Sequence, residues 1–348
     1  MTAFAYYRLP YLHHAHYVAQ RKGEPEVLSS VAELNGKEGF VIAPFSPSSD
    51  CPVLLIHPDE SKLLPISDAK AISTSDSTLG EDASDRDAYA GAFECFHQEL
   101  EKGTFRKIVL ARKATVRTAD KDFENLFMKA CRMYPRLFVS LVYTPQSGMW
   151  LMATPEILLK GELGNMSTMS LAGTQKAEPS RTVADYPVEG VEWSHKNQEE
   201  QQYVTDYIED CIKAFADDYQ LKGPYTTMAA NLYHLRTDIS FRLRNEGRLG
   251  DVIDALYPTP AVCGIPKEEA RRFILQYEHQ PRKYYSGFVG PISPQGKTHL
   301  FVSLRCMNIL PDGACELYAG GGLLKESEME KEWKETEAKM QTIRRVLL

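Results

Sequence analysis

The sequence lacks the features of a membrane protein and of a secreted, disulfide-rich protein. No stretch of its 348 residues approaches the roughly 18 to 20 apolar residues of a membrane-spanning helix, and the first residues lack the pattern of a secretory leader. Its 7 cysteines are scattered without a C-x-x-C pair, which is typical of reduced thiols. We therefore expect a soluble, cytoplasmic protein with no membrane partner.

The chain also lacks an excess of basic residues. It has 40 lysines and arginines against 47 aspartates and glutamates, and its net charge is -7. Nucleic-acid-binding domains usually present a basic face, so this balance argues against a nucleic-acid partner. Apolar residues are plentiful: 43% of the chain is hydrophobic and 10% is aromatic, which is enough to bury a large core. Length alone suggests about two domains, although one β-rich domain also reaches this size.

Short apolar, β-branched runs predict strands, and longer stretches with helical spacing predict helices. We expect strands within 38–57 and at 107–117, 137–144, 149–153, 156–161, 298–309 and 314–319. We expect helices near 84–102, 194–218, 266–279 and 327–346. This order favours an α+β fold with a large antiparallel sheet system over alternating βαβ units.

Three successive glycines at 320–322 precede a helix with an acidic face. Glu332, Glu335 and Lys339 recur at helical spacing, so two carboxylates and an ammonium share one side of that helix. A solvated helix face is the ordinary explanation of such a pattern. The glycines favour a binding role instead, because a strand that ends in glycines exposes N–H groups able to bind a carboxylate or a phosphate.

A second acidic segment at 194–202 contains Glu200. Its simplest interpretation is the polar start of a helix. If Glu200 faces Glu335 in the folded chain, however, the two carboxylates repel each other unless a cation lies between them. Oxygen ligands of this kind fit Mg²⁺ better than zinc. Whether the two segments meet stays open at the level of sequence.

Taken in order, these segments resemble the chorismate-utilising enzymes, which are the isochorismate, salicylate, anthranilate and aminodeoxychorismate synthases. The resemblance runs from about residue 90 to the C terminus and is faint before that. It is strongest to isochorismate synthases of the menaquinone or siderophore type. The matching stretches are 107–112 (KIVLAR), 153–156 (ATPE), 171–174 (LAGT), 196–200, 234–235, 258–264, 285–287 (YSG), Arg305 and 319–339.

The resemblance implies a single α+β domain of the anthranilate/isochorismate synthase type. In this fold two pseudo-symmetric halves form a large antiparallel β-sandwich ringed by helices. Residues 1–85 are expected to be a divergent N-terminal part of the same sandwich, and residues 86–348 the chorismate-binding catalytic region. The family further implies chorismate as the small-molecule substrate, Mg²⁺ as the cofactor, and a monomer.

The resemblance implies that Glu200 and Glu335 are Mg²⁺ ligands, with Glu332 close to the ion or joined to it through water. Relatives usually have an acid at position 197 and a histidine at position 201, where this chain has Asn197 and Gln201. The loss of a negative charge at 197 is expected to weaken the binding of Mg²⁺.

Water is the expected nucleophile, because relatives that add ammonia often have Gln where this chain has Lys107. Aminodeoxychorismate synthases usually have a nucleophilic Lys where this chain has Ala172. The implied reaction is the isomerisation of chorismate to isochorismate, with water entering at C2 and the C4 hydroxyl leaving. Lys107 is the implied base, which requires an uncharged amine, and Glu156 the implied acid, which requires a protonated carboxyl.

The remaining matched positions are implied to bind the substrate. Residues expected to hold its two carboxylates are Gly173, Thr174, Arg305, Gly320 and Lys339, and residues expected to line the ring pocket are His234, Ala261 and Tyr285. Two alternatives stay open. A salicylate synthase would also eliminate pyruvate, and such relatives more often have Thr at 261. A non-catalytic homologue would not be expected to retain Lys107, Glu156 and both acidic segments.

Overall fold

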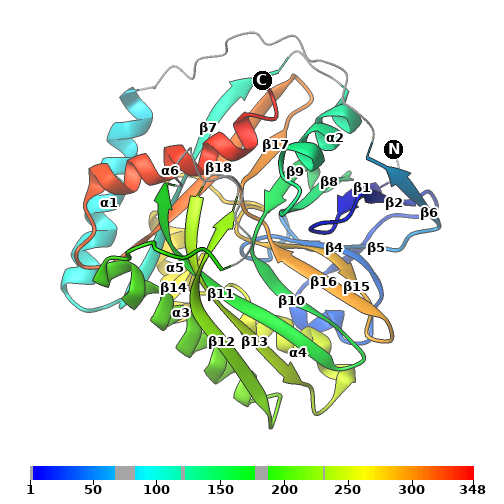
Figure 1. Ribbon diagram of the computed structural model, residues 1–348. Coiled ribbons are helices and arrows are strands. Elements are labelled where there is room, and N and C mark those ends of the chain that lie inside the picture. The colour runs from blue at the N-terminus through cyan, green and yellow to red at the C-terminus, as the bar shows by residue number, and fades with distance from the viewer. Residues whose placement is uncertain (1–2, 67–82, 119–121, 177–186, 230–231) are drawn as a thin grey trace.

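The structure is a computed structural model that describes residues 3–66, 83–118, 122–176, 187–229 and 232–348. Two nine-stranded sheets form its centre (Figure 1), and all the strand pairs described in them are antiparallel. In spatial order the first sheet contains β14 (Gly264–Ile265), β7 (Lys107–Arg117), β18 (Ala314–Leu323), β17 (Cys306–Ile309), β9 (Gly148–Thr154), β8 (Phe138–Thr144), β1 (Ala3–Arg8), β2 (His14–Gln20) and β6 (Glu60–Pro65).

The second sheet begins at β12 and ends at β3. In spatial order it contains β12 (Tyr219–Ala229), β13 (Leu232–Arg242), β11 (Asn165–Lys176), β10 (Ile157–Glu162), β16 (Lys297–Val302), β15 (Phe288–Ile292), β4 (Gly39–Ala43), β5 (Val53–Ile56) and β3 (Glu26–Leu28). The N-terminal strands therefore belong to both sheets. The proposed division of the chain at residue 85 stays a prediction.

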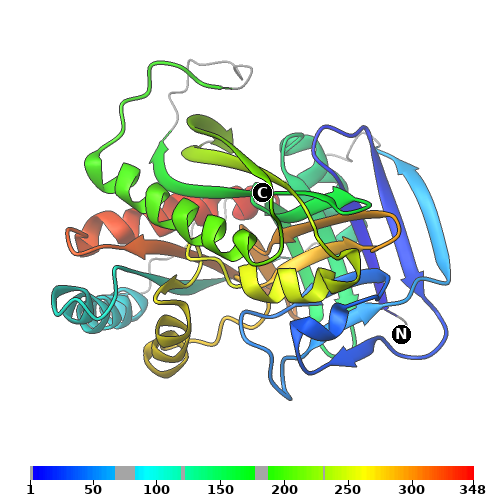
Figure 2. The ribbon, with the colours of Figure 1, turned by 90° about the horizontal axis from the view of Figure 1, so that it is seen from below.

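The helices lie outside the sheets (Figures 1 and 2). They are α1 (Ala83–Glu101), α2 (Phe123–Met133), α3 (His195–Lys213), α4 (Leu249–Leu256), α5 (Lys267–Tyr277) and α6 (Met329–Arg344), with short 3₁₀ helices at Val31–Leu34 and Glu246–Arg248. In Figure 1, α1 and α6 lie beside β7 and β18, and in Figure 2 α3 and α4 cover one side of the second sheet. No helix in these described ranges is long and apolar enough to cross a membrane.

Apolar side chains join the layers. The rings of Phe138 in β8 and Phe301 in β16 stack at a centroid distance of 4.1 Å, which connects the two sheets. On α3, Val204, Ile208 and Ile212 recur every four residues and pack into the core beneath the second sheet. A separate core under the first sheet includes side chains from α2 and α6. The predicted α+β fold with two large antiparallel sheets is confirmed.

Several boundaries differ from the sequence-based expectation. The strand expected at 298–309 is two strands, β16 and β17, separated by a turn in which Arg305 has a φ of 45°. The helix expected at 194–218 ends at Lys213. The strand expected to end before the glycines continues to Leu323, and glycines 320–322 pair with β7 inside the ladder. The binding role of the glycine N–H groups stays a prediction: β7 pairs with one edge of β18 at 320–322, while the pairing of β17 with the other edge ends at Tyr318.

Candidate active site

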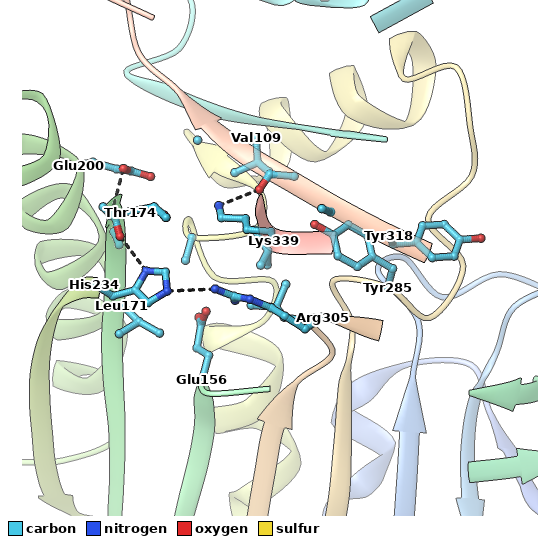
Figure 3. A pocket seen from close by; sticks show the side chains of 18 residues that line it. Val109, Glu156, Leu171, Thr174, Glu200, His234, Tyr285, Arg305, Tyr318 and Lys339 are labelled. Carbon is cyan, nitrogen blue, oxygen red and sulfur yellow. Dashed lines mark hydrogen bonds between the residues drawn. The ribbon is translucent and has the colours of Figure 1, made fainter. Parts of the chain in front are cut away.

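A cleft brings together β7, β11, β13, β18, α3 and α6 (Figure 3). It has about 570 Å³ of empty space, including its open mouth. Its lining residues are Val109, Glu156, Leu171, Ala172, Gly173, Thr174, Glu200, His234, Ala261, Val262, Tyr285, Leu304, Arg305, Tyr318, Ala319, Gly320, Gly322 and Lys339. All eight predicted substrate-binding residues, Glu156 and Glu200 are therefore in one place. Lys107, Glu332 and Glu335 are absent from this lining and lie directly behind Gly321 and Gly322.

The glycine triplet of β18 makes room for charged groups. A Cβ atom on Gly322 would lie 2.2 Å from Glu200 Oε1 and 2.7 Å from Lys107 Cε. A Cβ atom on Gly321 would lie 2.9 Å from Glu332 Oε2. Because real Cβ atoms do not approach other atoms so closely, side chains at these positions would displace the charged groups. Because glycine has no side chain, the triplet leaves room for these charged groups.

Lys107 is completely buried, at 0% exposure, because β7 lies between β14 and β18 in the sheet interior. This burial excludes the alternative that Lys107 is a surface lysine at the edge of a sheet. Its Nζ atom lies 2.9 Å from Glu200 Oε1. Burial has the largest single effect and raises the pKa of the Glu200 carboxyl, but Lys107, Lys196 and Lys339 together outweigh burial, and the net pKa is lowered. The other oxygen of Glu200 accepts a hydrogen bond of 3.2 Å from the Gly173 N–H.

The two acidic helix segments do meet in space. On α6, Glu332 forms an ion pair with Lys196 of α3, and Glu335 lies 2.7 Å from Lys339 Nζ. Burial, and then the neighbouring Glu335 carboxylate, raise the pKa of Glu332. That repulsion shows that Glu332 and Glu335 are close enough to act on one another. Glu200 faces the same three-glycine segment from the side of α3.

The acidic cluster, defined as Glu200, Glu332 and Glu335, has the donor atoms of a site for a hard cation, since it offers only carboxylate oxygens. In the structure each of these carboxylates is neutralised by a lysine. As the side chains stand, no group of three or more histidine, cysteine or acidic residues in the described part of the chain is arranged to hold a metal ion. Ion binding at the cluster therefore requires its lysine pairs to separate.

Glu156 lies between β9 and β10 and is 2% exposed. Burial raises the pKa of its carboxyl to about 7, although the positive charges of Arg305 and Lys107 act in the opposite direction. The Thr259 hydroxyl donates a long hydrogen bond, 3.4 Å, to Glu156 Oε1. A large fraction of Glu156 is thus protonated near neutral pH, which is the condition that a general acid requires.

Arg305 and His234 are in direct contact in the cleft. The Arg305 Nη2 atom lies 3.0 Å from His234 Nε2, and His234 Nδ1 lies 2.7 Å from the Gly173 carbonyl oxygen. Figure 3 shows Glu156 beside Arg305, and its dashed lines lead from Arg305 through His234 towards Glu200.

The remaining predicted residues lie between the two ends. Lys339 donates a hydrogen bond of 2.9 Å from Nζ to the Gly320 carbonyl oxygen. The ring of Tyr285 stacks on that of Tyr318 at 5.5 Å, and a Cβ atom on Gly320 would lie 2.9 Å from the Tyr285 hydroxyl oxygen. Ala261 forms part of the lining without a polar contribution.

Sequence reasoning missed a buried ion pair that holds one wall of the cleft. Arg282 Nε lies 2.6 Å from Glu278 Oε2, and the guanidinium also donates to the carbonyl oxygens of Val262 and Val109 at 2.6 and 2.8 Å. Glu278 in turn accepts a hydrogen bond of 2.7 Å from the Ala111 N–H. The pair thus fastens the turn carrying Ala261 and Val262 to β7. In the sequence, the only indication of this ion pair was the charged residue Arg282 shortly before the Y-S-G motif.

Two other residues gained a role only from the structure. Lys196 belongs to a matched stretch, but its partner Glu332 is 136 residues away in sequence. Gln201, where relatives usually have histidine, donates from Nε2 to Ser170 Oγ at 2.7 Å and to Thr237 Oγ1 at 3.2 Å, so it fastens α3 to the second sheet. Asn197 lies against the Gly173 turn, at 3.2 Å from the position of a Cβ atom there.

Comparison with known proteins identifies relatives of this chain. A Mycobacterium tuberculosis protein named as a candidate isochorismate synthase, MenF, is 32% identical over 254 residues, which are 69% of this chain and 67% of that protein. The isochorismate synthase MenF of Escherichia coli K12 is 30% identical over 267 residues, which are 76% of this chain. The match covers 61% of that relative, so this chain spans less than two thirds of it.

The solved structure of MenF from Escherichia coli, a menaquinone-specific isochorismate synthase, has the same fold. The superposition gives a TM-score of 0.80 at 22% sequence identity and covers 100% of this chain and 89% of the other. The sequence model of the chorismate-binding enzymes matches residues 55–348, which include every residue of the cleft named above. From this match, and from the relatives of similar sequence, the chain belongs to the chorismate-binding enzyme family.

Proposed function

We propose that the protein is an isochorismate synthase, which converts chorismate into isochorismate. The observation that carries the proposal is the presence of two unlike groups at one site: a fully buried lysine, Lys107, directly beside the cleft, and a buried carboxyl, Glu156, in its lining, whose pKa is raised to about 7. Addition of water with loss of a hydroxyl needs one group to take a proton and another to give one. The relatives named as isochorismate synthases support the same reaction.

In the proposed reaction the oxygen of water forms a bond to C2 of the ring, the ring double bonds shift, and the C4–oxygen bond breaks. The amine of Lys107 takes a proton from the attacking water. The carboxyl of Glu156 gives its proton to the departing hydroxide, which leaves as water. One water enters and one leaves, so the product is an isomer. Lys107 must first release a proton, and Glu200 holds its Nζ atom in position at 2.9 Å.

Two cationic side chains are placed to bind the carboxylates of the substrate. Arg305 is 7% exposed, and its planar guanidinium suits bidentate pairing with a carboxylate. Lys339 lines the same cleft from α6. Tyr285, Ala261 and Leu304 enclose the space between them, where the ring would lie.

We further propose that Glu200, Glu335 and Glu332 bind Mg²⁺ when the substrate enters. The acidic cluster supports this, because oxygens of Glu332 and Glu335 lie beside Gly321 and an oxygen of Glu200 lies beside the next residue, Gly322. Bound Mg²⁺ would polarise the ring carboxylate and stabilise charge during bond exchange. With Asn197 near the cluster in place of an acid, we expect weaker ion binding than in relatives that carry the acid.

The activity is tested by incubating the purified chain with chorismate and MgCl₂ and separating the products by chromatography. Isochorismate alone supports the proposal. Salicylate together with pyruvate would assign the chain to the salicylate synthases. No product with the wild type, under conditions in which an isochorismate synthase of known activity turns over, would refute the function.

The ion site is tested by titrating MgCl₂ into the chorismate-saturated protein in a calorimeter, a measurement that does not depend on turnover. Glu335→Gln is expected to weaken the binding of Mg²⁺ by about 10-fold or more, since it removes one charged oxygen ligand. The exposed Glu101→Gln on α1 is the matched control and should bind like the wild type. Equal affinity in all three proteins would refute the assignment.

A further inference from the structure

We propose that His234 is a positioning residue, which holds the Arg305 guanidinium and joins it, through the backbone carbonyl and N–H of Gly173, to Glu200. The inference deepens the proposed function and rests on it for its kinetic test. Its structural claim concerns a specific tautomer of one imidazole, and this claim is tested without any substrate.

A β-bulge in β11 creates the contact. In the ladder with β13, Ala172 pairs with Leu235 and Gln175 pairs with Tyr233, so two residues, Gly173 and Thr174, lie opposite the single residue His234. Gly173 has a φ of 68°, a left-handed conformation that glycine adopts without strain. The bulge turns the Gly173 peptide out of the regular ladder. Its carbonyl therefore meets a side chain in place of a backbone N–H.

The partners of His234 fix its tautomer. A carbonyl oxygen only accepts hydrogen bonds, so Nδ1, at 2.7 Å from the Gly173 oxygen, must carry the proton. A guanidinium only donates, so Nε2, at 3.0 Å from Arg305 Nη2, must be unprotonated. One proton on the ring therefore satisfies both contacts. A second proton would place two donors against each other.

The surroundings keep the imidazole neutral. His234 is 4% exposed, and burial lowers its pKa well below the ordinary value. The positive charges of Arg305 and then Lys339 act in the same direction. A neutral ring with its only N–H engaged by a carbonyl is poorly suited to give a proton to the substrate. This leaves orientation of Arg305 as the role that the contacts define.

Arg305 projects from a turn in which its own backbone is strained. It is a non-glycine residue with a φ of 45°, in the turn between β16 and β17. His234 engages Nη2, which leaves other N–H groups of the fork for a carboxylate of the substrate. Without that acceptor the long side chain would regain rotamer freedom, and part of the binding free energy would be lost in ordering it again.

The same contacts connect the two ends of the cleft. Arg305 donates to His234, His234 donates to the Gly173 carbonyl, and the Gly173 N–H donates to Glu200, which pairs with Lys107. The backbone N–H and carbonyl of one residue, Gly173, are thus both used. A change at His234 is therefore expected to affect Arg305 directly and the Lys107–Glu200 pair through Gly173.

The tautomer is tested by NMR of protein labelled with ¹⁵N-histidine, with His234 assigned from the spectrum of His234→Gln. We expect a neutral ring with the proton on Nδ1 at every pH from about 5 to 9, without chorismate. Resonances showing the proton on Nε2, or titration of this ring between pH 5 and 8, would overturn the proposal. This outcome is independent of whether the chain turns over chorismate.

The positioning role is tested by two amides that each mimic one nitrogen. Glutamine places its amide oxygen near the position of Nε2 and retains an acceptor for Arg305, whereas asparagine places its amide nitrogen near Nδ1 and loses that acceptor. We expect His234→Asn to raise the KM for chorismate about 10- to 100-fold, because a charged hydrogen bond is lost. His234→Gln should recover most of that loss, with kcat changed less than KM in both.

The half-buried His299→Gln on β16 is the matched control and should retain wild-type KM. Equal KM values in wild type, His234→Asn and His234→Gln would refute the positioning role. If the wild type forms no isochorismate, the proposed function fails, and chorismate affinity by calorimetry replaces KM in the same comparison. The expected order of affinity is then wild type, glutamine variant, asparagine variant.

Discussion

The two ends of the cleft bury similar numbers of polar groups but neutralise them differently. At the acidic end three carboxylates, Glu200, Glu332 and Glu335, are each paired with a lysine from another segment or turn. At the arginine end, defined by Glu156, His234 and Arg305, Glu156 and His234 are kept neutral by shifts of their pKa values. Burial raises the pKa of Glu156 to about 7 and lowers that of His234 well below its ordinary value.

The difference follows from which partners the fold supplies. A buried charge is tolerated when an opposite charge lies beside it, and otherwise the group changes its protonation state. β7, α3 and α6 each bring a lysine to the acidic end, and these lysines together outweigh burial in lowering the pKa of Glu200. At the arginine end the nearest groups to Glu156 are a hydroxyl and a guanidinium that already donates to His234. The acidic end thus suits a base and a cation, and the arginine end suits an acid and a carboxylate anchor.

The largest expected effect comes from removing the lysine of the acidic end. Lys107→Ala should lower kcat by about 10² to 10⁴, because a positioned general base is lost, while KM changes little. Binding of chorismate, measured by calorimetry, should persist. The matched control is Lys222→Ala on an exposed part of β12. If Lys107→Ala keeps more than about a tenth of wild-type turnover, or no longer binds chorismate, the base assignment is wrong.

Removing the titrating carboxyl of the arginine end should have the next largest effect. Glu156→Gln keeps the shape but cannot give a proton, so kcat should fall by about 10² to 10³. In the wild type kcat should decline as the pH rises through about 7, since the acid is then ionised. This decline should be absent in the variant. A wild-type profile that is flat between pH 6 and 9 would contradict the assignment of Glu156 as the acid.

The same substitution also affects stability, with a defined sign. The pKa of Glu156 is about 7 in the folded chain, above its ordinary value of 4.5, so its contribution to stability is complete below 4.5 and is lost as the pH rises through 7. Glu156→Gln removes this dependence. The free energy of unfolding of the variant, measured by urea denaturation, should therefore rise relative to wild type between pH 5 and 8.

Filling the space beside β18 should damage the acidic end alone. In Gly322→Ala the added Cβ would lie 2.2 Å from Glu200 Oε1, so the Lys107–Glu200 pair must move. We expect kcat to fall about 10- to 100-fold and the free energy of unfolding to fall by about 1 to 3 kcal/mol. Gly91→Ala on α1, where nothing lies within 4 Å of the new Cβ, is the control and should be neutral or slightly stabilising. Full activity in Gly322→Ala would show that the close pair is dispensable.

The smallest effect is expected at the ring pocket between the two ends. Ala261→Thr adds a methyl and a hydroxyl beside the ring and should divert a minor part of the flux towards loss of pyruvate. Such small changes in a pocket are worth about 1 to 3 kcal/mol. Pyruvate is measured with a coupled lactate dehydrogenase assay and isochorismate by chromatography. Isochorismate as the single product at an unchanged rate would show that position 261 does not select between the two reactions.

The sequence predicted which residues line the cleft, but it did not predict most of the contacts between them. Glu156, Arg305 and Lys339 were assigned from matched motifs, and all three line the cleft. Pairings such as Lys196 with Glu332 were not predicted, because contacts between segments so distant in sequence depend on how α3 and α6 pack. The boundary of the strand also differed, since glycines 320–322 lie inside β18 and pair with β7.

By itself, the sequence determined local structure and the identity of the chemical groups. Apolar runs such as 107–111 form strands and the spacing of Val204, Ile208 and Ile212 forms a buried helix face, because both depend on the periodicity of neighbouring residues. Only the tertiary structure decided which groups are charged. The same side chain, glutamate, is paired and ionised at Glu200 but holds its proton up to about pH 7 at Glu156. The physical reason is that protonation depends on burial and on nearby charges, which distant parts of the chain supply.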